Sequence, residues 1–198
     1  MNLRKLLLFL GILLIVGGIG VIVWFFAQNK VSEDKMKVYT NEFLESLEKE
    51  PVIEEKPQVK VLVGDTIGVL EFPAFNNERI AVKEGTSNYI LSISAGHMTA
   101  TEQVWDESGN SAIAAHNNTF FKNVKDFEIG DKVIVYTRTG IYEYEVYLKK
   151  TIEPTDLSIL DDISGQKTLT LITCNFSGSK RVIVQAKGGV KIAEAKDI

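Results

Sequence analysis

The chain has 198 residues, a formal net charge of −4 and a hydrophobic fraction of 45%. A mildly acidic chain with no basic stripe interleaved with aromatic residues lacks the electrostatic footprint of a nucleic-acid-binding protein, so no nucleic-acid partner is expected. The single cysteine, Cys174, excludes an internal disulfide, so the folded part must depend on its apolar core for stability.

The N-terminal segment has the composition of a membrane-spanning helix. No charged residue occurs between Leu6 and Ala27, and about 22 residues form a helix of roughly 33 Å, which matches the hydrocarbon thickness of a bilayer. The large aromatics of Phe25-Phe26 stand where a signal peptidase needs small side chains, which predicts an uncleaved signal anchor. The basic pair Arg4-Lys5 precedes the span, so the positive-inside rule predicts a cytoplasmic N-terminus and an extracytoplasmic folded domain.

An amphipathic pattern follows the span. Residues 31–50 carry apolar side chains at three- to four-residue spacing among charges, which predicts a helix. Its polar face is acidic, which favours a stalk that packs loosely on the domain over a membrane-surface helix. Pro51 and Pro57 bracket an acidic linker. The predicted organisation is a cytoplasmic N-terminus (1–5), a transmembrane signal anchor (6–27), a helical stalk and linker (28–58) and a folded domain (59–198).

The folded domain is predicted to be mostly β. Thr139-Gly140 joins two of its strands in a tight hairpin, and short helical pieces are expected at 88–92, 124–127 and 154–160. Seven or more short strands in about 140 residues favour a closed barrel or a sandwich. The clearest strands are Ile67–Phe72, Ile80–Val82, Ser111–Ala115, Lys132–Arg138, Ile141–Lys149, Thr168–Cys174 and Arg181–Lys187.

Three residues at strand ends could carry chemistry. Cys174 ends a β-branched, apolar run, and His116 ends a run of small and apolar residues. A histidine at one strand end can reach a thiol at another and raise its reactive thiolate fraction. If the strands around residues 175–180 form a hairpin, Arg181 lies opposite Cys174 and can face an oxyanion formed at an attacked carbonyl. Taken alone, each residue is more often structural, and a lone cysteine is more often a buried apolar side chain.

The residues around the cysteine resemble a known family. Thr170-Leu171-Ile172-Thr173-Cys174 matches the Thr-Leu-x-Thr-Cys signature of sortases, the membrane-anchored cysteine transpeptidases of Gram-positive bacteria, and the arginine follows at the spacing of that family. Ala115 is a departure, because many sortases have glycine before the histidine; the added methyl crowds the strand and leaves the role of His116 intact. Further similar blocks, in the family's order within residues 60–190, are Glu84–Asn88, Ala95–Met98, Gly109–His116, Phe120-Phe121 and Ile129–Val133.

The resemblance implies a closed sortase-type barrel of about eight strands and a set of site residues. Cys174 would be the nucleophile, His116 the general acid/base, and Arg181 the residue that positions the sorting motif and stabilises the oxyanion. Thr173 is either a plain β-branched strand residue or a hydroxyl and backbone group that helps to hold the intermediate. The implied reaction cleaves an LPxTG-like sorting signal between Thr and Gly through a thioacyl-enzyme. The acyl group then passes to a peptidoglycan precursor or cross-bridge amine, which anchors surface proteins to the cell wall.

Other polar residues are given no catalytic role. His97 resembles a non-catalytic sortase position. Asp126, Glu128, Glu102 and Glu107 could form an oxygen-ligand Ca²⁺ site, as some sortases have near the substrate groove, but a solvated acidic surface is the favoured interpretation. No cofactor is therefore expected to be required.

Competing interpretations differ in their motifs. L,D-transpeptidases have an arginine two residues after the cysteine, whereas Arg181 is seven residues after Cys174. Papain-like peptidases place the cysteine before the histidine, which is the reverse of the order in this chain. The non-enzymatic alternative is a membrane-tethered barrel that binds cell-wall material and buries Cys174. Among sortases, a single N-terminal anchor suits a class A-like anchoring enzyme or the class D group, and we favour class A-like.

Overall fold

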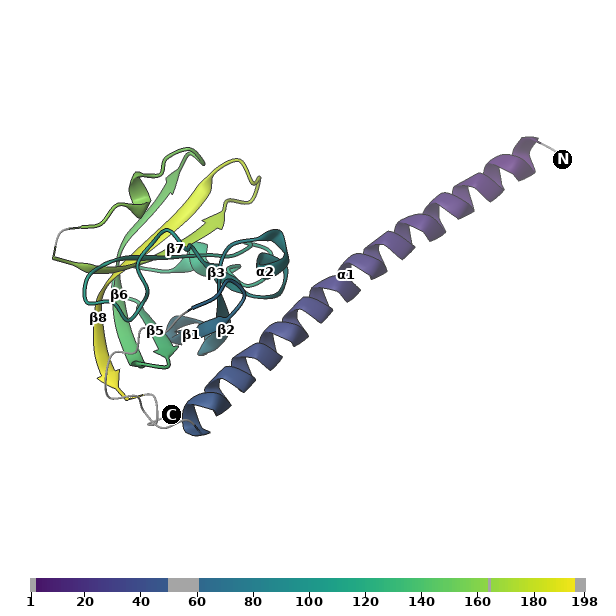
Figure 1. Ribbon diagram of the computed structural model, residues 1–198. Coiled ribbons are helices and arrows are strands. Elements are labelled where there is room, and N and C mark those ends of the chain that lie inside the picture. The colour runs from purple at the N-terminus through teal and green to yellow at the C-terminus, as the bar shows by residue number, and fades with distance from the viewer. Residues whose placement is uncertain (1–2, 50–60, 164, 195–198) are drawn as a thin grey trace.

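One long helix leads into a β-barrel. The structure is a computed structural model that describes residues 3–49, 61–163 and 165–194. Helix α1, Leu3–Lys49, is continuous and extends well beyond the barrel (Figure 1). Its N-terminal half exposes a run of large apolar side chains, and among the described residues it is the one helix long and apolar enough to cross a membrane. Such a surface is unfavourable in water and suits a lipid environment.

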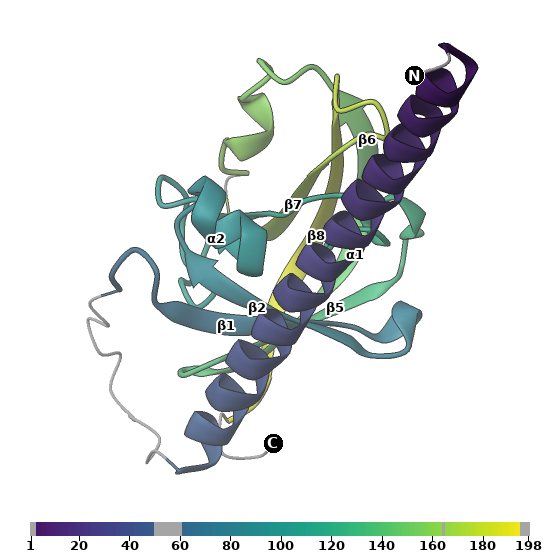
Figure 2. The same cartoon turned by 90° about the vertical axis from the view of Figure 1, so that its right-hand side faces the viewer.

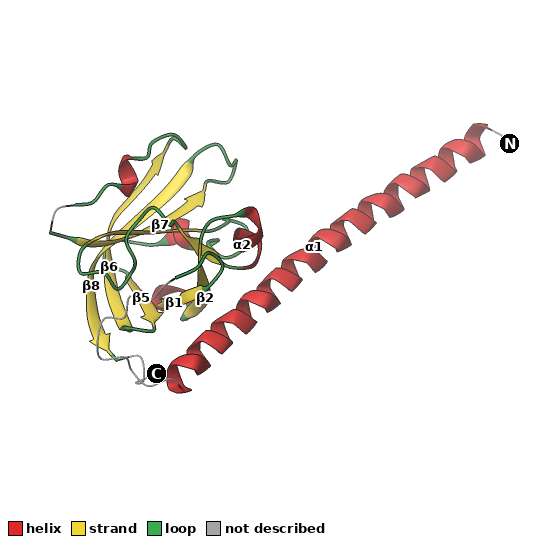
Figure 3. Ribbon diagram, in the orientation of Figure 1, coloured by secondary structure: helices red, strands yellow, loops and turns green. Residues whose placement is uncertain are grey.

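Eight strands form the closed barrel (Figure 3). Their order around the barrel is β1-β2-β3-β4-β7-β8-β6-β5. The strands are β1 Thr66–Phe72, β2 Glu78–Glu84, β3 Ala95–His97, β4 Gly109–Ala114, β5 Lys132–Thr137, β6 Gly140–Ile152, β7 Lys167–Cys174 and β8 Arg181–Ala193. The prediction of a closed barrel of about eight strands is therefore confirmed, and the sandwich alternative is wrong.

The parallel pairing of β4 with β7 positions the candidate site. Among the described strands, β2–β3 and β4–β7 are the parallel pairs, and the other neighbours are antiparallel. β4 and β7 are neighbours in the barrel although β5 and β6 come between them in the sequence. Because parallel neighbours end at the same edge of a sheet, the residues that follow β4 and those that end β7 meet at one end of the barrel.

Aromatic side chains pack together in the barrel core. The rings of Phe72 and Phe127 meet edge to face with centroids 5.1 Å apart, and Phe121 lies 6.1 Å from Phe72. The ring of Phe75 also meets that of Phe127 edge to face, with centroids 4.9 Å apart. Each such pair contributes about 1 kcal/mol beyond the burial of its area. The aromatic and β-branched residues that favour extended backbone thus also fill the interior.

The C-terminal half of α1 docks on the barrel wall formed by β1 and β2 (Figure 2). Phe43 and Leu47 are buried there, at 4% and 3% exposure, and Lys83 places its ammonium 4.0 Å from the centroid of the Tyr39 ring. The two apolar residues join a cluster with Val69, Tyr136 and Ile141. This packing is closer than the loosely packed stalk expected for residues 31–50. The predicted linker between Pro51 and Pro57 lies outside the described residues.

The short helices follow the predictions only in part. The piece expected at 88–92 is α2, Asn88–Ile93, whose N-cap Ser87 accepts a hydrogen bond from the Ile90 N–H at 3.3 Å. The pieces expected at 124–127 and 154–160 are the shorter 3-10 helices η2, Val124–Asp126, and η3, Ser158–Leu160. A third, η1, Pro73–Phe75, was not predicted. The Asp156 carboxylate accepts hydrogen bonds from the Ser158 N–H and hydroxyl, and this local turn replaces the helical start expected there.

Candidate active site

Cys174 and Arg181 face each other across the β7–β8 hairpin. Cys174 is the last residue of β7 and Arg181 the first of β8, and the two are paired in the antiparallel register. The loop of residues 175–180 is closed by the Asn175 N–H, which donates to the Lys180 carbonyl oxygen at 3.0 Å. The predicted position of Arg181 opposite the thiol is therefore confirmed.

His116 leaves the neighbouring strand at the same end of the barrel. The parallel register pairs Ala114 with Ile172, and the Ala115 N–H continues it by donating to the Ile172 carbonyl oxygen at 3.1 Å. Cys174 lies two residues beyond Ile172, and His116 lies two residues beyond Ala114 in the chain that leaves β4, so both stand at this end of the barrel. The His116 side chain is exposed and Cys174 is half-buried, so the site opens to solvent. The structure thus brings together all three residues that the sequence singled out.

Thr173 joins the two strands immediately before the candidate site. Its side chain is buried, and its hydroxyl donates a hydrogen bond of 2.8 Å to the carbonyl oxygen of Ala115. That carbonyl belongs to the peptide group that leads into His116. In this structure the hydroxyl proton of Thr173 therefore orients the backbone that carries the candidate base.

Asn117 makes a second link that the sequence did not reveal. Its amide nitrogen donates a 2.7 Å hydrogen bond to the carbonyl oxygen of Asn175. Asn117 follows His116 and Asn175 follows Cys174, so this bond clamps the two strand exits together on the far side of the site. No sequence signal pointed to it, because an asparagine in a loop is usually a turn residue.

The Arg181 guanidinium bends back over its own hairpin. Its Nη1 donates to the carbonyl oxygens of Gly178 and Lys180 at 3.3 and 3.5 Å. These long hydrogen bonds hold the cation against the hairpin loop, and the described contacts give it no carboxylate partner. The arrangement leaves the positive charge available for an anion at the mouth of the site.

A buried polar network fixes the chain between β6 and β7. The Asn110 and Gln185 amide nitrogens both donate to the Ile159 carbonyl oxygen, at 2.9 and 3.3 Å. Gln185 also donates to the Thr170 hydroxyl, which in turn donates to the Asn110 amide oxygen at 2.7 Å. Because these groups are buried, their mutual satisfaction holds η3 firmly against β4, β7 and β8.

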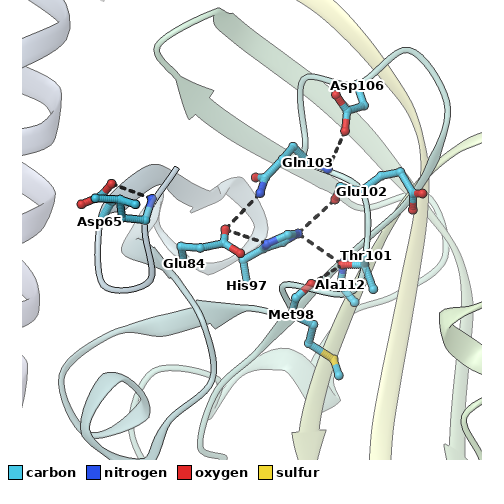
Figure 4. A network of polar contacts seen from close by, with 10 residues as sticks. Asp65, Glu84, His97, Met98, Thr101, Glu102, Gln103, Asp106 and Ala112 are labelled. Atoms are coloured by element: carbon cyan, nitrogen blue, oxygen red, sulfur yellow. Dashed lines mark hydrogen bonds and ion pairs between the residues drawn. The ribbon is translucent and has the colours of Figure 1, made fainter. Parts of the chain in front are cut away.

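His97 belongs to a separate, buried network (Figure 4). Its side chain is 0% exposed, with Nδ1 2.9 Å from Glu84 Oε2 and Nε2 3.0 Å from the carbonyl oxygen of Glu102. The carbonyl can only accept, so Nε2 carries a proton. Burial opposes the ionisation of Glu84, but hydrogen bonds from His97 and Gln103 and the charge of His97 outweigh it and lower the pKa of this carboxyl. Both nitrogens of His97 are engaged in structure, which agrees with the expectation that it is not catalytic.

The acidic residues considered for Ca²⁺ do not gather around one point. Within residues 3–49, 61–163 and 165–194, no group of three or more His, Cys, Asp or Glu side chains is arranged to hold a metal ion. Asp126 instead lies 3.2 Å from the ammonium of Lys125, and the backbone N–H of Glu128 donates to Asp131.

Comparison with known proteins agrees with this fold and site. Residues 70–188 match the Sortase domain family. The chain is 29% identical over 137 residues to Sortase D of Bacillus subtilis (strain 168), covering 67% of this chain and 68% of that protein. It is 28% identical over 141 residues to Sortase A of Bacillus anthracis, covering 68% and 65%. The structure of a Clostridium perfringens Sortase D5 transpeptidase superposes with a TM-score of 0.70 at 27% identity, covering 78% of this chain and 98% of that one.

A closed barrel that brings a strand-end cysteine, a histidine and an arginine to one edge is the arrangement of a cysteine transferase. The chain belongs to the sortase family, whose members are cysteine transpeptidases of the cell wall. The L,D-transpeptidase, papain-like and non-enzymatic interpretations are therefore wrong.

Proposed function

We propose that the domain of residues 59–198 cleaves an LPxTG-like sorting signal between Thr and Gly with Cys174, His116 and Arg181. The observation that carries the proposal is the strand register. Cys174 pairs with Arg181 in the β7–β8 hairpin, and the parallel β4–β7 pair delivers His116 to the same edge. A nucleophile, an acid/base and a fixed cation at one edge are what acyl transfer through a thioester requires.

The reaction proceeds in two steps, acylation of the enzyme and transfer of the acyl group. The Cys174 thiolate attacks the Thr carbonyl carbon, and the Arg181 guanidinium stabilises the oxyanion of the tetrahedral intermediate. The His116 imidazolium donates its proton to the departing glycine amine, which leaves a thioester on Cys174. A peptidoglycan precursor or cross-bridge amine then attacks the thioester, His116 takes the proton, and the thiolate departs.

Membrane anchoring is part of the same proposal. The apolar half of α1 spans the bilayer with residues 1–5 in the cytoplasm, since Arg4-Lys5 precedes the span. The barrel then lies outside the cell, where sorting signals and cell-wall amines are found. We propose that the reaction needs no cofactor, because every chemical role is assigned to a side chain. The relatives include Sortase D and Sortase A proteins, so the choice between a class A-like and a class D enzyme depends on the peptide it prefers.

The full chain in detergent, incubated with a panel of sorting-signal peptides and an amine acceptor, tests the proposal. We expect ligated product and a trapped thioester on Cys174, both lost in Cys174→Ala with the fold retained. Arg181→Ala should lower kcat/KM by about 100-fold, as removal of an oxyanion donor does. Lys180→Ala is the matched control. Lys180 is the residue before Arg181, and its ammonium pairs with Glu153 at 2.9 Å. Absence of both product and thioester with every peptide would refute the assignment.

A further inference from the structure

The continuous helix α1 sets the position of the barrel relative to the membrane. The apolar stretch ends at Ala27, and the docked part of the same helix begins at Met36, which is buried against the barrel. At 1.5 Å per residue, about 13 Å separates the two. With no break in the helix between them, the orientation of the barrel follows from the orientation of the span.

β8 leads from the docking site to the candidate active site. Ala193, its last residue, packs on the same cluster as Phe43 and Leu47, and Arg181, its first residue, pairs with Cys174. Twelve steps of about 3.3 Å make β8 roughly 40 Å long. From Leu47 back to Ala27, α1 rises about 30 Å. β8 is therefore long enough to bring its Arg181 end level with the end of the apolar stretch.

The two perpendicular views support this direction. In Figures 1 and 2 the β7–β8 loop lies at the end of the barrel that points toward the N-terminal half of α1. The end of β8 near the C-terminus lies instead beside the C-terminal end of the helix (Figure 1). The Arg181 end of the barrel thus faces the level at which the bilayer surface would lie.

The loops at that end present apolar side chains to solvent. Phe176, two residues after Cys174, is fully exposed. Ile152, the last residue of β6, pairs with Arg181, so the chain that follows β6 emerges beside the hairpin and carries Leu157, which is 65% exposed. An unpacked phenylalanine at a loop tip is unfavourable in water, and moving its ring into a less polar environment is favourable. Aromatic side chains are enriched at membrane–water interfaces.

We propose that the β7–β8 loop rests on the bilayer that α1 spans, with Phe176 inserted at the interface and Leu157 beside it. The inference rests on the proposed membrane anchoring and adds a second attachment point on the catalytic domain itself. Cys174 is then held at the height of the lipid headgroups. Its substrates are reached where their own membrane-bound parts emerge from the bilayer.

Tryptophan fluorescence of the full chain in phosphatidylglycerol–phosphatidylcholine vesicles tests the contact. The two native tryptophans, Trp24 and Trp105, are replaced by phenylalanine, and Phe176→Trp is introduced as the probe. Val190→Trp is the matched control, because Val190 is an exposed apolar residue of β8 toward the opposite end of the barrel. We expect the probe at 176 to emit at shorter wavelength, to be quenched by brominated lipid, and to be several-fold less accessible to aqueous acrylamide than the probe at 190.

The outcomes separate this inference from the proposals on which it rests. If the protein floats with the vesicles but both probes are quenched equally by acrylamide, the second contact is refuted and the anchoring stands. If the protein does not float with the vesicles, the anchoring fails and this inference fails with it. Transfer to a soluble amine, measured on the same samples, reports on the catalytic proposal independently of either result.

Discussion

Replacing Thr173 with valine removes one hydroxyl and leaves the shape of the side chain almost unchanged. The hydroxyl donates 2.8 Å to the carbonyl oxygen of Ala115, and both residues are buried. Losing a donor to a buried carbonyl lowers the free energy of unfolding by about 1–3 kcal/mol. The same carbonyl leads into His116, and a displacement of about 1 Å at a catalytic group lowers the rate by roughly 100-fold. We therefore expect Thr173→Val to lose both stability and kcat/KM.

Thr173→Ser is the matched control for this prediction. It keeps the hydroxyl and deletes one methyl group, which lowers the stability by about 1 kcal/mol. We expect its kcat/KM to stay within a few-fold of the wild type. Denaturant unfolding in detergent measures the stability, and cleavage of a quenched fluorescent peptide measures kcat/KM. The profile of Cys174 alkylation adds a third measurement, because displacing a neighbouring base changes the reactivity of a thiol.

The three measurements distinguish the two roles of the hydroxyl. If Thr173→Val loses activity while its unfolding midpoint and alkylation profile match the wild type, the hydroxyl acts on the intermediate and not on the backbone of His116. If the variant keeps full activity, neither role holds. If serine is as damaging as valine, the methyl group and its packing matter more than the hydrogen bond.

Three further predictions concern the rest of the fold. Glu84→Gln should lower the free energy of unfolding by roughly 2 kcal/mol at pH 7 by weakening the charged hydrogen bond to His97. Because the pKa of Glu84 lies below its ordinary 4.5, the difference in stability between the wild type and this variant, measured in thermal melts, should shrink as the pH falls below 4.5. Burial lowers the pKa of Lys167 to about 8 from 10.5, so the free energy of unfolding of the wild type should rise between those pH values. Lys167→Met should abolish this rise. At pH 7 it should also raise the free energy of unfolding by about 1 kcal/mol, a figure reduced for solvent screening. Phe43→Ala should release the docked half of α1 and cost about 3 kcal/mol of local stability, seen as faster amide exchange there.

Each of these three predictions has a matched control on an exposed residue: a glutamate, a lysine and an apolar residue of α1, in that order. Glu45→Gln removes a surface partner of Lys49 and should change the stability by less than about 0.5 kcal/mol. Lys150→Met and Val38→Ala should leave, respectively, the pH dependence and the exchange of α1 unchanged, since both side chains are exposed. Equal effects of a test variant and its control would contradict the corresponding prediction.

The hairpin that joins Cys174 to Arg181 could be predicted from the sequence because its partners are close together. A turn-rich loop between two β-branched runs leaves few registers, and the antiparallel pairing follows. The parallel β4–β7 register could not be derived in this way, because β5 and β6 intervene and no local rule links Ala114 with Ile172. Strand-end positions showed only that His116 could reach the thiol, and the pairing of the two was favoured only once the resemblance to a family was added.

Other features were missed because the chain offers too little pattern. β3 has three residues, too few for an alternation of apolar and polar side chains to be visible. The apolar face of residues 31–50 was recognised, but its partner surface around Tyr136 comes from a distant strand. His97 has no sequence signal for its partner, since Glu84 lies on another strand and meets it only in the folded barrel.

The parallel β4–β7 pair also determines which parts of this end of the barrel can vary in evolution and which are fixed. Cys174 ends β7 and His116 lies two residues beyond the end of β4, so barrel closure fixes the position of both, with Thr173 joining the two strands beneath the surface. Exposed loops at this end of the barrel, such as residues 175–180 after β7, can change in length and composition while the register stays. Substitution or exchange of these loops could therefore redirect the choice of peptide and acceptor without rebuilding the reaction centre.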